Sequence, residues 1–319
     1  MIVDLPSTTT SAVNRKLVAL RNNGGAVALG RVLTLVIVTD DGAQAEEAIE
    51  AANAASREHP CRVLVLARGA KRAAARLDAQ IRVGGDAGAS EVLVLRIYGP
   101  LANEGASVVV PLLLPDTPVV AWWPGDAPRV PAADPIGRLA QRRITDAGMQ
   151  AAPPRVLHLR RDSYVPGDTD LAWTRLTLWR GLLAAALDQP PYEDVETVTV
   201  TGAADSPSTD LLAGWLRSRL EVPVRRVRSG PGGGLSAVVL SRRSAPIELS
   251  RPNGKIGILR QPGQPDRRAA LQRRKVRDCL AEELRWLDAD EIYEAALAGL
   301  AGVEGGVGKA SARRSGTRR

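Results

Sequence analysis

"RVLTLVIVTD", at residues 31–40, is the stretch that decides the fold. Its unbroken run of aliphatic and β-branched residues is typical of strands that helices cover on both faces of a parallel sheet. Residues 42–59, "GAQAEEAIEAANAASREH", then predict a helix, and residues 61–68, "CRVLVLAR", repeat the buried-strand pattern. Strand, helix and strand form a βαβ unit, so we expect both strands to lie parallel in one sheet.

The same alternation extends through the first half of the chain. It predicts an N-terminal α/β domain with a layered, mostly parallel sheet, extended on one side by an antiparallel pair. The other predicted elements are a helix at 8–20 closed by Gly24 and Gly25, strands at 76–83 and 90–99 joined by a turn at 84–86, a short helix at 101–114, and a strand at 117–125.

Two adjacent prolines, Pro153 and Pro154, mark the best domain boundary, because proline does not fit inside a helix or a central strand. We therefore predict domains at 1–152 and 153–301. The second is also α/β, with a mixed sheet that contains antiparallel hairpins. Its predicted elements are helices at 170–187 and 206–220, a strand at 195–202, extended runs at 223–229, 235–243, 246–252 and 255–262, a tight hairpin at Asn253-Gly254, and a closing helical region at 267–300.

The composition is that of a soluble globular protein, with 45% apolar and 24% charged residues. Residues 1–16 lack the pattern of a signal peptide, no apolar run is long enough to span a membrane, and the two cysteines are too few for a disulfide framework. We expect a cytoplasmic protein. The last eleven residues carry +5 of the formal charge of +8, so 302–319 is predicted to be a disordered basic tail, and a nucleic-acid partner is not favoured.

Motifs for catalysis, cofactors and metals are absent. The chain has neither the P-loop pattern nor the dinucleotide fingerprint. His59 and His158 lie too far apart in sequence for a typical zinc spacing, and neither has a neighbouring nucleophile. "GPGGG" at 230–234 precedes a predicted strand rather than a helix, which favours a loop over a phosphate cradle. We predict no catalytic residue, no cofactor and no metal.

The stretch "SYVPGDTDLAWTRLTLWRGLLAAAL", at 163–187, places cations among apolar residues of one helix. Thr169 or Asp170 is expected to cap it, with Asp168 adding favourable charge at its start. Arg175 and Arg180 fall on an apolar arc that includes Leu171, Leu178 and Trp179, extended by Trp173. Each guanidinium needs a carboxylate, a phosphate or an aromatic face. The arc is therefore either internal core or a protein interface, where Trp and Arg are enriched.

The strand "VVAWWPG" raises the same two alternatives. Successive strand residues point to opposite faces, so Trp122 and Trp123 cannot face one layer. At least one is expected near the carboxyl end of the sheet, where open α/β sheets form their clefts. Core packing under helices is the other interpretation.

Three stretches, "LLLPDTPVVAWWPGD", "RRITDA" and "YVPGDTDLAWTRLTLWR", occur in this order and with these spacings. Together they resemble the OpcA family of glucose-6-phosphate dehydrogenase assembly proteins, over residues 1–301. The resemblance implies a non-enzymatic partner that promotes the active oligomer of the dehydrogenase and supports NADPH production in the oxidative pentose phosphate pathway. It agrees with the absence of a catalytic set.

Three hypotheses follow. In the first, the chain is an assembly factor that engages the dehydrogenase through Trp122, Trp123, Arg142, Arg143, Asp168, Asp170, Trp173, Arg175 and Arg180. In the second, it is an enzyme or sensor that binds a sugar phosphate in the sheet-end cleft, with Arg142 and Arg143 as an anion clamp. In the third, the basic tail binds RNA.

Overall fold

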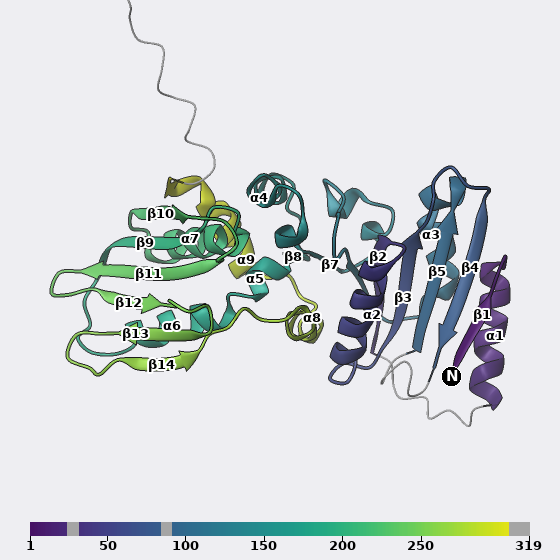
Figure 1. The fold of residues 1–319 in the computed structure, drawn as a ribbon, viewed down its shortest axis with the longest axis horizontal. Coiled ribbons are helices and arrows are strands. Elements are labelled where there is room, and N and C mark those ends of the chain that lie inside the picture. The colour runs from purple at the N-terminus through teal and green to yellow at the C-terminus, as the bar shows by residue number, and fades with distance from the viewer. Residues whose placement is uncertain (24–31, 84–90, 306–319) are drawn as a thin grey trace, which may run out of the picture. The chain divides into compact units, whose positions relative to one another are not determined.

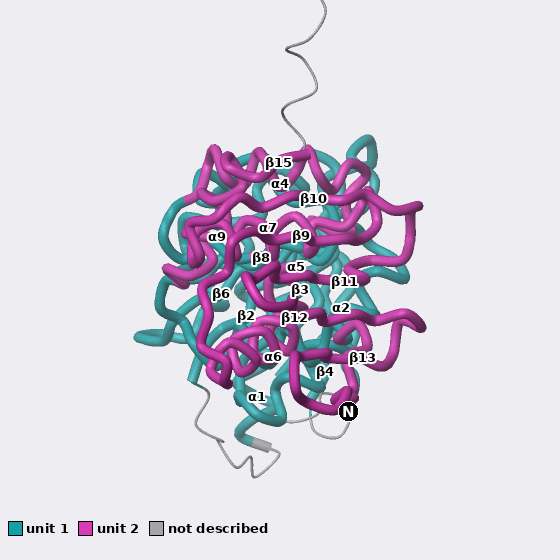
Figure 2. Tube along the Cα trace, turned by 90° about the vertical axis from the view of Figure 1, so that its left-hand side faces the viewer, with its two compact units in different colours: residues 1–146, 165–169, 275–289 teal, residues 147–164, 170–274, 290–319 magenta. Residues whose placement is uncertain are grey.

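A computed structural model of the chain describes residues 1–23, 32–83 and 91–305. By internal contacts it divides into two compact units, each assembled from three separate segments, which Figure 2 shows in two colours. The first unit contains Met1–Asp146, Val165–Thr169 and Lys275–Ala289. The second contains Ala147–Tyr164, Asp170–Arg274 and the described residues from Asp290 onward. The domains predicted from the sequence are contiguous, whereas these units alternate along the chain.

The first unit contains an eight-stranded sheet. The five strands β5, β3, β2, β6 and β7 are parallel. Beyond β5, strand β4 pairs antiparallel with β5, and β1 pairs antiparallel with β4 (Figure 1). The predicted βαβ unit and antiparallel extension are confirmed. In spatial order the strands are β1 (Ile2–Leu5), β4 (Arg76–Arg82), β5 (Glu91–Tyr98), β3 (Cys61–Arg68), β2 (Leu33–Asp40), β6 (Val119–Trp122), β7 (Arg142–Thr145) and β8 (Asp168–Asp170).

Helices cover the first sheet, as the unbroken apolar strands require. On one face, Val36 and Leu64 join a core cluster with Val13 and Leu17 of α1 (Thr10–Asn23). Helix α2 (Ala43–Ala55) packs on β2 and β3, and α8 (Val276–Arg285) packs on α2. The helix predicted at 101–114 is instead three short turns, the 3-10 segments Gly99–Asn103 and Val110–Leu112 around α3 (Gly105–Val109). Pro111 lies inside the predicted range and does not fit the interior of an α-helix. The predicted stop at Gly24 and Gly25 and the turn at 84–86 lie outside the described residues.

The second unit contains a seven-stranded mixed sheet. Strands β9, β10 and β15 are parallel, and β11 to β14 follow as an antiparallel series that starts against β9. The predicted α/β fold with antiparallel hairpins is confirmed. In spatial order the strands are β14 (Arg267–Ala270), β13 (Ile256–Arg260), β12 (Ile247–Ser250), β11 (Leu235–Arg242), β9 (Val195–Ala203), β10 (Val224–Ser229) and β15 (Val303–Glu304).

Two edge strands differ from the elements predicted for their residues. Arg267–Ala270 was predicted to begin a helical region but pairs with β13 as strand β14. Val303–Glu304, assigned to the basic tail, pairs with β10 as β15. In both segments, hydrogen bonds to an existing sheet edge decide the backbone conformation, and local sequence does not. Residues 306–319 of the predicted tail lie outside the described part of the chain.

Three helices of the second unit begin at residue types that favour helix starts, which are proline in the first turn and serine or aspartate at the N-cap. Pro153 and Pro154 form the first turn of α4 (Pro153–Asp162), where a missing amide hydrogen costs nothing. Ser206 caps α7 (Pro207–Leu220), and Asp290 caps α9 (Glu291–Gly299). Helices α7 and α9 cross closely, since a Cβ on Gly214 would lie 2.2 Å from the Ala296 carbonyl oxygen.

The helix predicted at 170–187 divides into α5 (Leu171–Thr174) and α6 (Thr177–Leu187). At the break, the Leu176 amide donates to the Trp173 carbonyl at 2.9 Å, a bond one residue shorter than the α-helical spacing. This break changes the helix phase. Trp173 and Trp179 join the core of the second unit, whereas Leu178, predicted on the apolar arc, is 47% exposed.

Candidate functional site

Arg142 lies on β7 and is buried inside the first unit. Its Nη2 lies 2.5 Å from Glu283 Oε2, and its Nη1 donates to the Asp288 carbonyl at 2.5 Å. The other carboxylate oxygen of Glu283 accepts from the Thr169 hydroxyl at 3.3 Å. Arg142 is 3% exposed. Such a cation is stable in the interior only because the acid and the carbonyl replace its water shell.

Arg143 follows Arg142 and points to the opposite face of the strand. Its Nε donates to Asp168, and its two other nitrogens donate to the carbonyls of Ala140 at 2.8 Å and Pro166 at 2.6 Å. Gly167 permits this arrangement, because a Cβ there would lie 2.2 Å from the Gln141 carbonyl oxygen. An anion clamp formed by Arg142 and Arg143 would have to displace both of their carboxylates.

Asp170 caps α5 with a fully buried carboxylate. Its Oδ1 accepts from the Ala172 amide at 2.9 Å, and its Oδ2 accepts from the Ala147 amide at 2.9 Å. The predicted cap is confirmed, with Asp170 rather than Thr169 as the capping residue. The carboxylate joins the start of the helix to the segment that precedes α4.

Replacing Asp170 with alanine should lower the free energy of unfolding by about 2 kcal/mol, at the upper end for a helix cap, because two buried amides lose their acceptor. Urea unfolding followed by circular dichroism measures this cost. Asp170→Asn keeps one oxygen acceptor and should lose less. Equal stability of the alanine variant and the parent chain would contradict the capping role.

Trp173, the residue of α5 with the largest side chain, packs inside the second unit. Its indole Nε1 donates to Asp290 Oδ2 at 2.8 Å, and its ring centroid lies 5.9 Å from that of Tyr293. The guanidinium carbon of Arg180 lies 3.8 Å from the Trp173 ring centroid, a cation–π contact. Of the alternatives predicted for this arginine, which were a carboxylate, a phosphate or an aromatic face, the structure shows the aromatic face.

The remaining predicted residues are also internal. Trp122 and Trp123 are each 1% exposed, and Trp123 belongs to the core cluster that contains Val13 and Leu17 of α1. Arg175, at the break between α5 and α6, is 8% exposed and lines a cavity of the second unit. In all, eight of the nine predicted contact residues are buried, and Arg180 is half-buried. Direct contact of these residues with a partner stays a prediction.

Two family models match the chain, one in each half. Both describe parts of a "Glucose-6-phosphate dehydrogenase subunit", its N-terminal domain over residues 52–162 and its C-terminal domain over residues 166–297. The chain belongs to the OpcA family of glucose-6-phosphate dehydrogenase assembly proteins. The predicted resemblance is confirmed. A comparison with curated proteins returned no match.

Solved structures similar to this OpcA-family chain are distant. A structure titled "X-ray crystal structure of Glucose-6-phosphate 1-dehydrogenase from Mycobacterium avium" has 11% identity and a TM-score of 0.39, over 85% of this chain and 90% of that one. A second, titled "Trehalose-6-phosphate from E. coli bound with UDP-2-fluoro glucose", has 9% identity and a TM-score of 0.25. That match covers 63% of this chain and 65% of the other.

Two large exposed aromatic residues of this OpcA-family chain were not predicted as candidate site residues. Trp286, which follows α8, is 68% exposed, and Tyr192, which precedes β9, is 77% exposed. Neither lies in the stretches that carry the resemblance, and exposure of a single aromatic cannot be inferred from periodicity. The acidic partners Glu283 and Asp290 were missed for a related reason, since they lie 141 and 117 residues from Arg142 and Trp173.

The described residues contain no group of three or more His, Cys, Asp or Glu side chains that could hold a metal ion. In the same part of the chain, no helix combines the length and the hydropathy needed to cross a membrane.

Proposed function

We propose that this chain is a non-catalytic assembly factor that binds glucose-6-phosphate dehydrogenase, promotes its active oligomer, and so supports NADPH supply. The observation that carries the proposal is the pair of family matches, which name a dehydrogenase subunit in both halves of the chain. The chemistry of the described arginines agrees with it. Arg142 and Arg143 are bound to acids and carbonyls of their own chain, which suits a structural role better than bond breaking.

The proposal is tested by mixing the purified chain with its cognate dehydrogenase. We expect NADPH formation from glucose 6-phosphate to rise, and the dehydrogenase to shift to a larger oligomer in size-exclusion chromatography with light scattering. The chain alone should form no NADPH. Turnover by the chain alone, or a mixture in which neither the rate nor the oligomer changes, would exclude the proposed function.

We further propose that Trp286 contacts the dehydrogenase. A tryptophan that is 68% exposed leaves a large apolar ring in water, and burial of such rings dominates the energy of many protein interfaces. Its neighbour Arg285 extends an exposed charged group, paired with Glu58 at 3.1 Å, as the polar rim of an interface does.

Trp286→Ala should weaken binding to the dehydrogenase by about 30-fold, because a hot-spot tryptophan contributes about 2 kcal/mol or more. Titration calorimetry with the dehydrogenase measures the dissociation constant. The matched control is Tyr192→Ala, which removes another exposed aromatic residue, from the second unit, and should change the constant less than about twofold. If the two variants bind alike, Trp286 is not the contact.

A further inference from the structure

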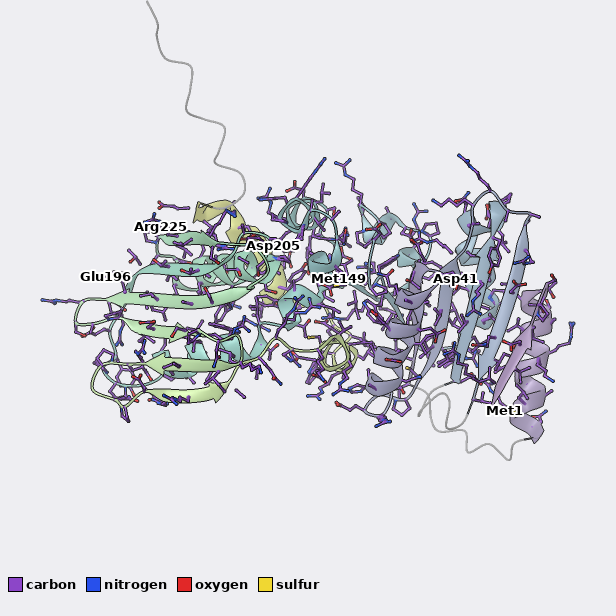
Figure 3. All side chains as sticks on the ribbon, in the orientation of Figure 1. Met1, Asp41, Met149, Glu196, Asp205 and Arg225 are labelled. Carbon is purple, nitrogen blue, oxygen red and sulfur yellow. The ribbon has the colours of Figure 1, made fainter. Side chains whose placement is uncertain are left out.

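The second unit contains a cavity of about 250 Å³ that none of the functional proposals above uses. Three arginines line it, Arg175, Arg251 and Arg273, and the only acid among its lining residues is Asp205. Asp205, labelled in Figure 3, lies in the turn between β9 and α7. Its Oδ1 accepts from the Gly232 amide at 3.3 Å, so this carboxylate holds the glycine-rich loop. The lining therefore carries a net positive charge.

Arg251 is the decisive residue of this cavity. It is 8% exposed, and it donates to two backbone carbonyls, from Nη1 to Leu271 at 3.0 Å and from Nη2 to Leu235 at 2.6 Å. Its Nε is buried without a hydrogen-bond partner, and no carboxylate among the described residues pairs with the guanidinium. The buried guanidinium of Arg226, in contrast, has the acid Asp210 beside it.

The missing counter-charge has an energetic consequence. Burial lowers the pKa of Arg251 from its ordinary value, and the positive charge of Arg273 lowers that pKa further. A guanidinium does not lose its proton at physiological pH, so the charge remains and is unfavourable. An anion placed in the cavity would reduce this penalty, because it would supply the missing counter-charge.

The backbone around the cavity has the form of an anion site. Ser206, Pro207 and Ser208, the capping residue and first turn of α7, line the cavity and present the positive end of a 14-residue helix to it. Gly232, Gly233 and Gly234 also line it, and a Cβ on Gly234 would come within 3.6 Å of Arg251 Nη2. The stretch "GPGGG" precedes a strand, as predicted, yet it lies at the start of a different helix, α7. Sequence order alone could not reveal this proximity.

We infer that this cavity binds the phosphoryl group of a small phosphorylated metabolite, held by Arg251, Arg273 and the start of α7. The volume suits a compact molecule, and Trp179 supplies an apolar wall beside the guanidinium, with its ring centroid 5.5 Å from Arg251 Cζ. The inference concerns the second unit alone and does not depend on contact with the dehydrogenase.

The test is calorimetric titration of the full chain with orthophosphate, glucose 6-phosphate and glucose as probes. Orthophosphate and glucose 6-phosphate should bind saturably, and glucose should not. Equal affinity for the two phosphates identifies a site for the phosphoryl group alone, whereas tighter binding of the sugar phosphate adds contacts to the sugar. Absence of binding by both phosphates up to about 10 mM would overturn the inference, because a site of this charge should hold an anion below that concentration.

Two variants at Gly233 separate charge from folding. Gly233 has open space around its Cβ position and no positive φ, so a side chain fits there. Gly233→Asp places a carboxylate at the cavity and should weaken phosphate binding about tenfold or more, whereas the neutral isostere Gly233→Asn should retain it. Arg251→Gln should also weaken binding at least tenfold. Phosphate binding that both Gly233→Asp and Arg251→Gln leave unchanged would place the anion elsewhere and overturn the assignment.

Discussion

Replacing Arg226 with methionine should lower the free energy of unfolding of the second unit by about 3–5 kcal/mol, the cost of breaking a buried ion pair. The Arg226 side chain is fully buried, and its Nε donates to Asp210 Oδ1 at 2.7 Å. Its other nitrogens donate to carbonyls of the β9 and β10 ends, including Gly202 at 2.9 Å and Ala203 at 2.6 Å. Methionine fills similar space but leaves the Asp210 carboxylate without the cation that is hydrogen-bonded to it.

The pH dependence of that variant follows from the remaining acid. Burial raises the pKa of Asp210 from its ordinary value, and the attraction of Arg226 opposes the rise. Without Arg226 the folded-state pKa rises further above the unfolded one. A carboxyl with a raised folded pKa is best tolerated below its unfolded pKa, and stability is lost as the pH rises through the folded value.

Urea unfolding at several pH values measures both effects. The deficit of Arg226→Met relative to the parent chain should be smaller in mildly acidic buffer than at neutral pH. The double variant Arg226→Met with Asp210→Asn removes both charges and should recover part of the loss. A single variant within about 1 kcal/mol of the parent at neutral pH would show that this pair does not hold α7 to the sheet.

Replacing Trp173 with alanine should also cost about 3–5 kcal/mol of unfolding free energy, the range for removal of a large buried side chain. The variant loses the hydrogen bond to Asp290, the ring contact with Tyr293 and the face on which Arg180 lies. Trp173→Phe keeps most of the ring and loses the indole donor. It should cost about 1 kcal/mol, because Asp290 still accepts the amides of α9.

This experiment also decides between the two interpretations of Trp173. If the residue is internal core, the alanine variant loses stability, and its binding to the dehydrogenase falls only as far as the protein unfolds. If Trp173 is an interface hot spot, the variant unfolds like the parent chain but loses affinity for the dehydrogenase. Comparing unfolding by urea with binding by calorimetry, on the same preparation, separates the two results.

The parts of the fold that were predictable are those that depend on local pattern. Strands β2 and β3 are buried along almost their whole length, as their runs of aliphatic residues predict. Strand β14 has the sequence "RRAA", with neither alternation nor β-branched residues, and it exists because the edge of β13 offers hydrogen bonds. The break after α5 was likewise not predictable, because residues 174–177 contain no proline or glycine.

The candidate site also contains features that local sequence predicts and features that only the fold brings together. Asp170 is a helix cap, and a cap is visible in the few residues that surround it. The partners of Arg142 and Trp173 lie more than a hundred residues away, so only the fold brings them together. The cavity was missed because its glycines, its helix start and Arg251 come from separate stretches, each of which is ordinary by itself.

The alternation of the two units along the chain also bears on biosynthesis. Glu283, the acid beside Arg142, belongs to the third segment of the first unit, which ends at Ala289. A ribosome must therefore release the chain through residue 283 before the first sheet can pair the guanidinium of Arg142 with its acid, although domains commonly fold as they emerge. The second unit, apart from its last segment, is translated before the first is finished. A fragment that stops near residue 162 should consequently be recovered aggregated or degraded, and a chaperone that holds the nascent first half would raise the yield of native protein.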